Sequence, residues 1–364
     1  MYSFRHHHLL KILTSFETSR MPLDAYLARY FRETKAVGSK DRKVICETLY
    51  TMMRWKGLID AQIEKPASWE KRLAAYPTFR ENIAHFPLHV QVSFPKFLYS
   101  LFANAYPEQV QALCQALNTA APTTIRVNLL KTQRQTLIDT FPQAVPTTHA
   151  DTGLTFPKKI NFFASPEFKK GFFEIQDEAS QLVATHVRAK PGDHVLDYCA
   201  GAGGKTLAIA PGLEGAGQLY LYDIRPHALA EAKKRLKRAG VQNAQILDGD
   251  KLKKYHNKMD WVLVDAPCSG TGTLRRNPDM KWKITPDMID QLIHTQREIF
   301  DKALQFLKPG GTIVYATCSI LPCENQDQVA YFQKIYDLKA QAPAFQSLPA
   351  LGEMDGFFSQ NLIH

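Results

Sequence analysis

Residues 194–206 read HVLDYCAGAGGKT, a short apolar run that ends in an acid and passes into a glycine-rich turn. The apolar run predicts a buried strand, and KTLAIAP after the turn predicts a helix. Gly201, Gly203 and Gly204 allow the backbone to turn tightly and to approach a ligand closely. Their spacing fits neither the dinucleotide fingerprint nor the Walker A loop. The stretch therefore predicts a strand–loop–helix ligand site of another kind.

The same alternation of strand and helix continues along the chain. Further strands are expected at 218–224, 244–250, 259–267 and 311–319, and the main helices at 226–240 and 288–307. Apolar strands that alternate with amphipathic helices predict a parallel sheet covered on both faces. We therefore predict an α/β fold, with a Rossmann-like domain of strand order 3-2-1-4-5 over residues 176–364.

Two regions of different character precede that domain. Residues 1–120 carry apolar positions at helical spacing, with 16 Lys and Arg against 10 Asp and Glu. Arg54 and Lys56 flank Trp55 there, which indicates either an RNA-binding surface or a solvated helix face. Residues 121–175 alternate short strands with a helix, which indicates a small α/β module that leads into the next domain.

The bulk composition narrows the class of protein. A net charge of +10 and a pI near 9.2 favour a polyanionic partner, either nucleic acid or an anionic membrane. No run approaches the roughly 18 apolar residues of a membrane span, and we recognise no secretory signal. The six cysteines show no C-x-x-C pair, so we predict reduced thiols and no metal site. We expect a cytoplasmic monomer without membrane contact.

Acidic residues end four successive predicted strands. Asp197, Asp223, Asp250 and Asp265 stand where the carboxyl ends of parallel strands face one crevice. Asp223 lies 22 residues after Gly201, where a carboxylate accepts from ribose hydroxyls. Asp250 is placed to reach an adenine amino group. The arrangement is similar to Rossmann-like methyltransferases that bind S-adenosyl-L-methionine.

Two cysteines stand in small, polar surroundings after apolar runs, in DAPCSGTG and YATCSI. Cys268 follows the fourth predicted strand and Cys318 ends the fifth, so both thiols should open into the cofactor crevice. A thiolate that adds to carbon 6 of cytosine makes carbon 5 nucleophilic toward a methyl donor, which is covalent catalysis. The reaction also needs an acid or hydrogen-bond donor at ring nitrogen 3, and Asp265 is the candidate.

Four stretches together resemble the RNA 5-methylcytosine methyltransferase family, the bacterial group that modifies ribosomal RNA and its eukaryotic relatives. They are VLDYCAGAGGKT (195–206), DAPCSGTGTLRRNPDMKW (265–282), YATCSILPCEN (315–325) and FFEIQDEASQLVA (172–184). The resemblance is dense over 172–335, and MDGFF (354–358) and TIRVN (124–128) extend it more weakly. It thereby covers nearly the whole chain.

The resemblance implies a role for each site residue. Cys318 is the expected nucleophile, and Cys268 the cysteine that assists release of the methylated product. Lys205 is expected near the reacting groups. The expected cofactor contacts are Cys199, Ala200, Gly201, Ala202, Gly203, Gly204, Lys205, Asp223, Asp250 and Asp265. Where relatives commonly read CAAPGGK this chain reads CAGAGGK, a more flexible loop.

The leading hypothesis is transfer of a methyl group from S-adenosyl-L-methionine to carbon 5 of a cytosine in ribosomal RNA. The same chemistry on transfer RNA, and a catalytically silent RNA-binding assembly factor, are the alternatives. The intact cysteines and Lys205 argue against the silent factor. The glycine spacing argues against a dinucleotide oxidoreductase. Arg275, Arg276 and Lys281 follow the first cysteine motif and are candidates to hold RNA phosphate.

Overall fold

The computed structural model describes residues 3–19, 21–157 and 160–364, apart from the side chain of Asp250. The chain divides into two compact units. One unit comprises Met1–Ala120 together with Thr273–Pro286, and the other comprises Ala121–Gly272 together with Asp287–His364. In the described part of the chain, no helix is both long and apolar enough to cross a membrane.

The first unit is helical. Its helices are α1 (Phe4–Phe16), α2 (Leu23–Glu33), α3 (Ser39–Ala61), α4 (Trp69–Ala75), α5 (Leu88–Gln91), α6 (Lys96–Ala105) and α7 (Val110–Leu117). The long helix α3 buries Ile45, Leu49 and Met52, which are three or four residues apart and so lie on one face. These side chains pack with Ile12 and Leu13 of α1 in the unit's core.

The segment Thr273–Pro286, which follows the cysteine motif DAPCSGTG, belongs to the helical unit. Lys281 is 1% exposed, and its Nζ donates to the carbonyl oxygens of Arg54 and Ser93 and to Asn118 Oδ1, at 2.6, 2.7 and 2.6 Å. Burial lowers the pKa of Lys281 well below its ordinary value. Arg275 is also 1% exposed. The prediction that Arg275 and Lys281 hold RNA phosphate is therefore wrong, because both side chains are buried.

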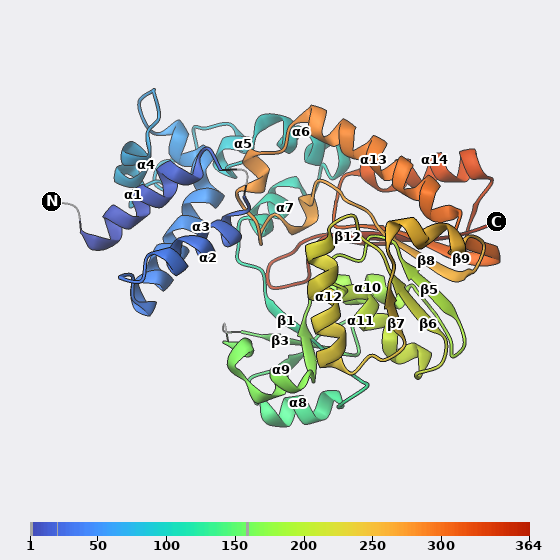
Figure 1. Cartoon of the computed structure of the whole chain (residues 1–364). Coiled ribbons are helices and arrows are strands. Elements are labelled where there is room, and N and C mark those ends of the chain that lie inside the picture. The colour runs from blue at the N-terminus through green and yellow to red at the C-terminus, as the bar shows by residue number, and fades with distance from the viewer. Residues whose placement is uncertain (1–2, 20, 158–159) are drawn as a thin grey trace. The chain divides into compact units, whose positions relative to one another are not determined.

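The first part of the second unit is a small antiparallel sheet of order β2-β3-β1-β4 (Figure 1). Its strands are β1 (Thr123–Val127), β2 (Val145–Pro146), β3 (Gly153–Phe156) and β4 (Phe173–Ile175), with α8 (Arg134–Thr140) and α9 (Pro166–Lys170). Phe156, Phe162 and Phe173 pack edge to face in its core. The predicted α/β module before the main domain is confirmed.

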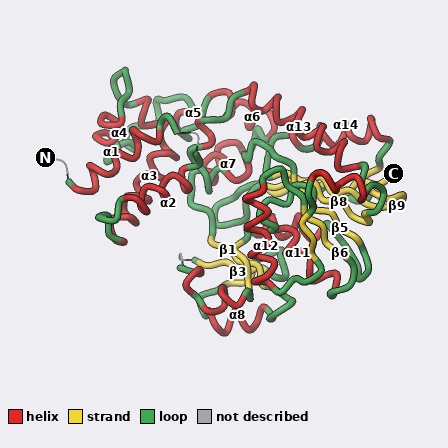
Figure 2. Tube along the Cα trace, viewed as in Figure 1, coloured by secondary structure: helices red, strands yellow, loops and turns green. Residues whose placement is uncertain are grey.

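The large sheet of the second unit contains five parallel strands in the order β7-β6-β5-β8-β9. All five are labelled in Figure 1, and Figure 2 shows the strands in yellow. They are β5 (His194–Asp197), β6 (Gln218–Leu221), β7 (Ala244–Ile246), β8 (Met259–Asp265) and β9 (Leu307–Thr317). Numbered along the chain this is 3-2-1-4-5, as predicted. Antiparallel β12 (Phe357–Ile363) follows β9 and pairs with β10 (Lys339–Ala340) and β11 (Phe345–Ser347).

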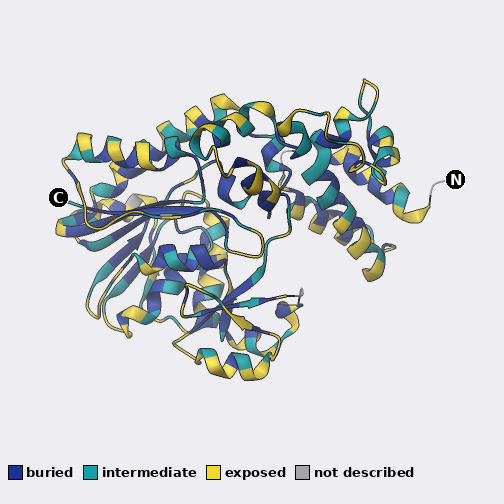
Figure 3. Ribbon diagram, turned by 180° about the vertical axis from the view of Figure 1, so that it is seen from behind, coloured by how far each residue is buried: buried dark blue, intermediate teal, exposed yellow. Residues whose placement is uncertain are grey.

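Strand residues alternate between two helix-covered faces. Leu196 and Tyr315 pack with Phe300 of α13 (Pro286–Leu304) and with α14 (Gln326–Tyr336). Val195 and Val314 face the opposite side and pack with α10 (Glu178–Thr185) and α11 (Gly204–Ile209). Helix α12 (Pro226–Ala239) packs against Leu221 of β6. Figure 3 shows the sheet between them as largely buried. Side chains alternate between the two faces of a strand, and because helices cover both faces, the side chains on both are apolar. Polar residues collect at the strand ends.

Candidate active site

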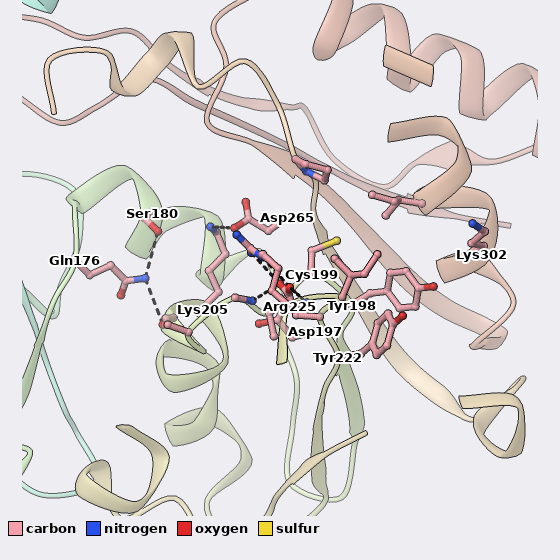
Figure 4. Close-up of a pocket in the computed structure, with 18 residues that line it drawn as sticks. Gln176, Ser180, Asp197, Tyr198, Cys199, Lys205, Tyr222, Arg225, Asp265 and Lys302 are labelled. Atoms are coloured by element: carbon pink, nitrogen blue, oxygen red, sulfur yellow. Dashed lines mark hydrogen bonds and ion pairs between the residues drawn. The ribbon is translucent and has the colours of Figure 1, made fainter. Parts of the chain in front are cut away.

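A cavity of about 600 Å³ lies at the carboxyl ends of β5, β6 and β8 (Figure 4). Asp197 and Asp265 are the last residues of β5 and β8, and Asp223 follows β6 by two residues. The lining consists of Gln176, Ser180, Asp197, Tyr198, Cys199, Ala200, Gly201, Ala202, Gly204, Lys205, Tyr222, Asp223, Ile224, Arg225, Asp265, Pro267, Ile299 and Lys302. The parallel topology thus brings these strand ends together at one edge of the sheet.

The glycine-rich loop forms one wall of the cavity through its backbone. Gly201 and Gly203 have φ angles of 52° and 75°, in the left-handed region that glycine adopts without strain. A Cβ added to Gly203 would also lie 3.2 Å from the Cβ of Ala232 in α12. The Gly201 amide donates to Asp223 Oδ2 at 2.8 Å, so the loop and the carboxylate hold each other in place.

The Asp223 carboxylate is 6% exposed and fully engaged in hydrogen bonds. Besides the Gly201 amide, it accepts from the backbone and the guanidinium of Arg225. Burial raises the pKa of Asp223, but the hydrogen bonds from Arg225 and Gly201 outweigh it, and the pKa lies below its ordinary value. Asp223 is therefore an ionised acceptor at neutral pH.

Asp197 is 2% exposed and is the most strongly desolvated acid of the cavity lining. Thr206 donates to its Oδ2 at 2.7 Å, and its Oδ1 has no hydrogen-bond partner among the described residues. Burial, with some help from the charges of Asp265 and Asp223, raises the pKa of Asp197 to about 7. A cationic ligand group in the cavity would find at Asp197 Oδ1 an acceptor that has no hydrogen-bond partner among the described residues.

Lys205 joins the glycine loop to the end of β8. Its ammonium is 2.5 Å from Asp265 Oδ2, and the side chain is 8% exposed (Figure 4). Burial lowers the pKa of Lys205, but the charges of Asp265 and then of Cys318 outweigh this, and the pKa lies above its usual value. Lys205 is therefore protonated at neutral pH, next to the Asp265 carboxylate that lines the cavity.

The sulfur atoms of Cys268 and Cys318 are 3.4 Å apart, and both thiols are free and partly buried. The pKa of Cys268 is raised well above its ordinary value, first by the hydrogen bond with Cys318 and then by burial. Cys268 is thus held as a neutral thiol beside the other sulfur. Cys268 and Cys318 are fifty residues apart in sequence but in direct contact, because β8 and β9 are neighbouring strands.

Hydrogen bonds fix the two cysteine loops against each other. The Gly272 amide donates to the Cys318 carbonyl at 3.0 Å. Glu324, fully buried, accepts from the Ser269 amide at 2.8 Å, from the Ser269 hydroxyl at 2.5 Å and from Gln296 Nε2 at 3.0 Å. One carboxylate therefore anchors the turn that carries Cys268. The sequence analysis did not single out Glu324, although it stands in the YATCSILPCEN motif.

Most of the sequence-predicted cofactor residues line the cavity. They are Cys199, Ala200, Gly201, Ala202, Gly204, Lys205, Asp223 and Asp265. Among the predicted site residues that the structure describes, Gly203, Cys268 and Cys318 do not line the cavity. The thiols lie beside it: Cys268 follows the lining residue Pro267, and the charge of Cys318 acts on Lys205. The side chain of Asp250 lies outside the described part of the structure.

Several lining residues were not predicted. Gln176 stands in the FFEIQDEASQLVA stretch, which gave a family signal but no role. Its Nε2 donates to Gly204 O at 3.3 Å, and its Oε1 accepts from buried Arg126 at 2.6 Å, so it braces the glycine loop (Figure 4). Arg225 and Lys302 add positive charge to the lining. No local pattern marks these side chains as cavity residues.

The donor set suits S-adenosyl-L-methionine. Its methionine part carries a cationic sulfonium and an ammonium, for which Asp197 offers an acceptor oxygen without a hydrogen-bond partner among the described residues. Its ribose diol requires acceptors such as Asp223, and its adenine requires apolar and aromatic surfaces such as Tyr222 and Ile224. The residues present therefore fit this group.

Two family models match the chain. The model described as 16S rRNA methyltransferase RsmB/F matches residues 184–363. The model of the ferredoxin-like domain of RsmF/B-like methyltransferases matches residues 94–161. The first match contains the glycine loop and both cysteine motifs, and the second overlaps the small antiparallel sheet.

Curated relatives and a solved structure agree with these matches. Ribosomal RNA small subunit methyltransferase B of Vibrio vulnificus (strain YJ016) is 35% identical over 283 residues, 74% of this chain and 66% of that protein. The protein of the same name from Escherichia coli O6:K15:H31 is 35% identical over 332 residues, 85% of this chain and 73% of that protein. The crystal structure of PH0851, at 22% identity, shares the fold with a TM-score of 0.82 over 98% of this chain and 97% of that chain.

Proposed function

The chain belongs to the 16S rRNA methyltransferase RsmB/F family, and from this we propose that it methylates carbon 5 of a cytosine in ribosomal RNA through a covalent bond to Cys318. As a member it is an S-adenosyl-L-methionine-dependent RNA cytosine-5 methyltransferase. The observation that carries the proposed mechanism is the 3.4 Å contact between the Cys268 and Cys318 sulfurs, within electrostatic reach of Lys205.

Cys318 is the proposed nucleophile from the family resemblance, and its sulfur lies 3.4 Å from that of Cys268. The hydrogen bond with Cys318 and burial raise the pKa of Cys268, which suits the second thiol to donate a hydrogen bond rather than to attack. The Cys318 thiolate forms a bond to ring carbon 6 of the cytosine. The Asp265–Lys205 pair supplies the proton or hydrogen bond that stabilises the negative charge that develops on ring nitrogen 3 as the sulfur adds to carbon 6.

S-adenosyl-L-methionine, when bound, supplies the methyl group as an electrophile to carbon 5. Solvent water accepts the carbon 5 proton, the electron pair of that bond forms the double bond between carbons 5 and 6, and the bond between carbon 6 and sulfur breaks, which restores the aromatic ring. We assign Cys268 to this last step: its thiol donates a hydrogen bond to the Cys318 sulfur and stabilises it as a leaving group. The same thiol contact therefore serves the release of product.

The proposed cofactor site is the loop from Cys199 to Lys205 with Asp223, Asp250 and Asp265. The cavity lining supports each of these except Gly203 and Asp250, which stay proposals from the family resemblance. We propose residues 1–120 as a helical RNA-binding region, 121–175 as an RNA-recognition-like module and 176–364 as the catalytic domain. We also propose that the protein acts as a cytoplasmic monomer.

Replacing Cys268 with Ala should trap the covalent protein–RNA adduct, because the leaving thiolate loses its hydrogen-bond donor. The adduct is measured as a denaturation-resistant gel shift after incubation with S-adenosyl-L-methionine and 16S ribosomal RNA or a mixture of transfer RNAs. Cys318→Ala should give neither adduct nor methylation. Cys323→Ala, a third half-buried thiol on a nearby turn, is the matched control and should behave as wild type.

Each other result has a definite reading. A trap with Cys318→Ala would reverse the two roles. An adduct with transfer RNA alone would replace ribosomal RNA as the substrate. If wild type methylates no cytosine in either RNA, the chain is the silent binding factor.

A further inference from the structure

Four hydrogen bonds reach the carboxylate that we propose as the ribose acceptor. Asp223 Oδ1 accepts from the Arg225 backbone amide and from Arg225 Nε, both at 2.9 Å. Oδ2 accepts from the Gly201 amide at 2.8 Å and from Arg225 Nη2 at 2.9 Å. A carboxylate has about four lone-pair sites, so this one is saturated.

The four donors differ in how easily they can leave. Two are backbone amides of the loop and of the turn after β6, which the fold holds in place. The other two belong to the Arg225 guanidinium, whose side chain is 58% exposed and lines the cavity. A ribose diol that binds Asp223 must therefore displace the guanidinium, since no other donor is free to move.

We propose that the Arg225 guanidinium competes with the cofactor's ribose for Asp223 and so lowers the affinity for S-adenosyl-L-methionine. The inference rests on the proposed function, in which Asp223 binds the ribose. The guanidinium offers the same two-pronged donor pattern as a vicinal diol, with the added attraction of its charge. When the cofactor binds, two neutral ribose hydroxyls replace the charged Arg225 guanidinium as donors to Asp223.

The expected size of the effect follows from the exposure of the pair. Ion pairs with one exposed partner contribute little, because water and salt screen them. Removing the guanidinium should therefore tighten cofactor binding about two- to fivefold. The gain should shrink as the salt concentration rises, because salt already weakens the ion pair in wild type.

The test is calorimetric titration of the full chain with S-adenosyl-L-homocysteine at low and high salt. Arg225→Ala should lower Kd about two- to fivefold at low salt. Arg225→Lys keeps the charge but loses the two-pronged geometry, so it should resemble Arg225→Ala. Lys302→Ala removes a charge from the same cavity lining and should change Kd less than Arg225→Ala does. For the 2′-deoxy analogue, which needs one acceptor fewer, the gain from Arg225→Ala should be smaller.

A Kd that is unchanged or raised in Arg225→Ala overturns the proposal, because the Arg225 guanidinium would then have no effect on binding or would orient Asp223 for the ligand. An equal gain in Lys302→Ala also overturns it in favour of a general charge effect. Asp223→Asn separates this from failure of the proposed function. If Asp223→Asn binds as well as wild type, or wild type does not bind at all, the ribose assignment itself fails.

Discussion

At the scale of the residue, the protonation states of four side chains determine what the cavity can do. Asp223 and Lys205 are charged at neutral pH, while Cys268 is held as a neutral thiol and Asp197 titrates near neutrality. The sequence predicted Asp197 and Asp223 as strand-end acids, because they follow apolar runs. It could not predict that one would be saturated with hydrogen bonds and the other would lack a partner.

Asp197 makes stability depend on pH. Its folded-state pKa of about 7 exceeds the unfolded value near 3.8, so the folded state binds more protons between these pH values. The cost of ionising the buried carboxyl is therefore absent below about pH 4 and grows until about pH 7. Asp197→Asn removes this titration, and its stability relative to wild type should rise across that window.

Urea unfolding of wild type and Asp197→Asn at several pH values measures the difference directly. Subtraction cancels the titration of every other group, provided that the substitution leaves them unchanged. A difference that is flat between pH 4 and pH 7 would contradict the raised pKa.

At the scale of the element, strand ends carry the chemistry and the loops after them need anchors. The sequence predicted the five parallel strands, but it ended the last helix at 307 and began the last strand at 311. The structure ends α13 at Leu304 and begins β9 at Leu307, because Leu307 pairs with Met259 before a bulge in β8 and β9. A Lys-Pro-Gly-Gly run looks like a helix stop, and only the neighbouring strand shows that it belongs to a bulged strand.

Glu324 is the anchor of the Cys268 turn, and its replacement should impair catalysis more than cofactor binding. In Glu324→Gln one side-chain oxygen becomes an amide that cannot accept, which leaves a donor of Ser269 or Gln296 unpaired. An unpaired buried donor costs about 1–3 kcal/mol. We expect a lower Tm and a lower kcat, with an unchanged Kd for S-adenosyl-L-homocysteine, because Glu324 does not line the cavity.

The matched control is Glu231→Gln on α12, where the carboxylate is exposed and pairs with Lys234. It should change neither Tm nor kcat measurably. Loss of cofactor binding in Glu324→Gln would show that the carboxylate supports the whole site rather than the cysteine turn.

At the scale of the whole molecule, the chain leaves the catalytic unit after Gly272 and returns to it at Asp287. The intervening segment completes the helical unit, and Lys281 holds it there through three oxygen acceptors. Lys281→Met should destabilise the helical unit by about 2–4 kcal/mol, since it leaves buried acceptors unpaired. Differential scanning calorimetry should show a transition lowered by at least about 4 °C.

Lys40→Met makes the same substitution at an exposed position of α3 and should leave the transition in place. An unchanged transition in Lys281→Met would mean that the three hydrogen bonds only offset the cost of burying Lys281 Nζ.

The sequence by itself determined the layered α/β fold, the strand order, the glycine loop and the family. These features rest on local patterns: alternation along strands, spacing along helices, and motifs of adjacent residues. Only the tertiary structure decided that the Cys268 and Cys318 sulfurs touch, that Arg225 covers Asp223, and that Lys281 is buried. Each of these depends on the direction in which a side chain points and on what packs against it, and neither is encoded in the residue's sequence neighbours.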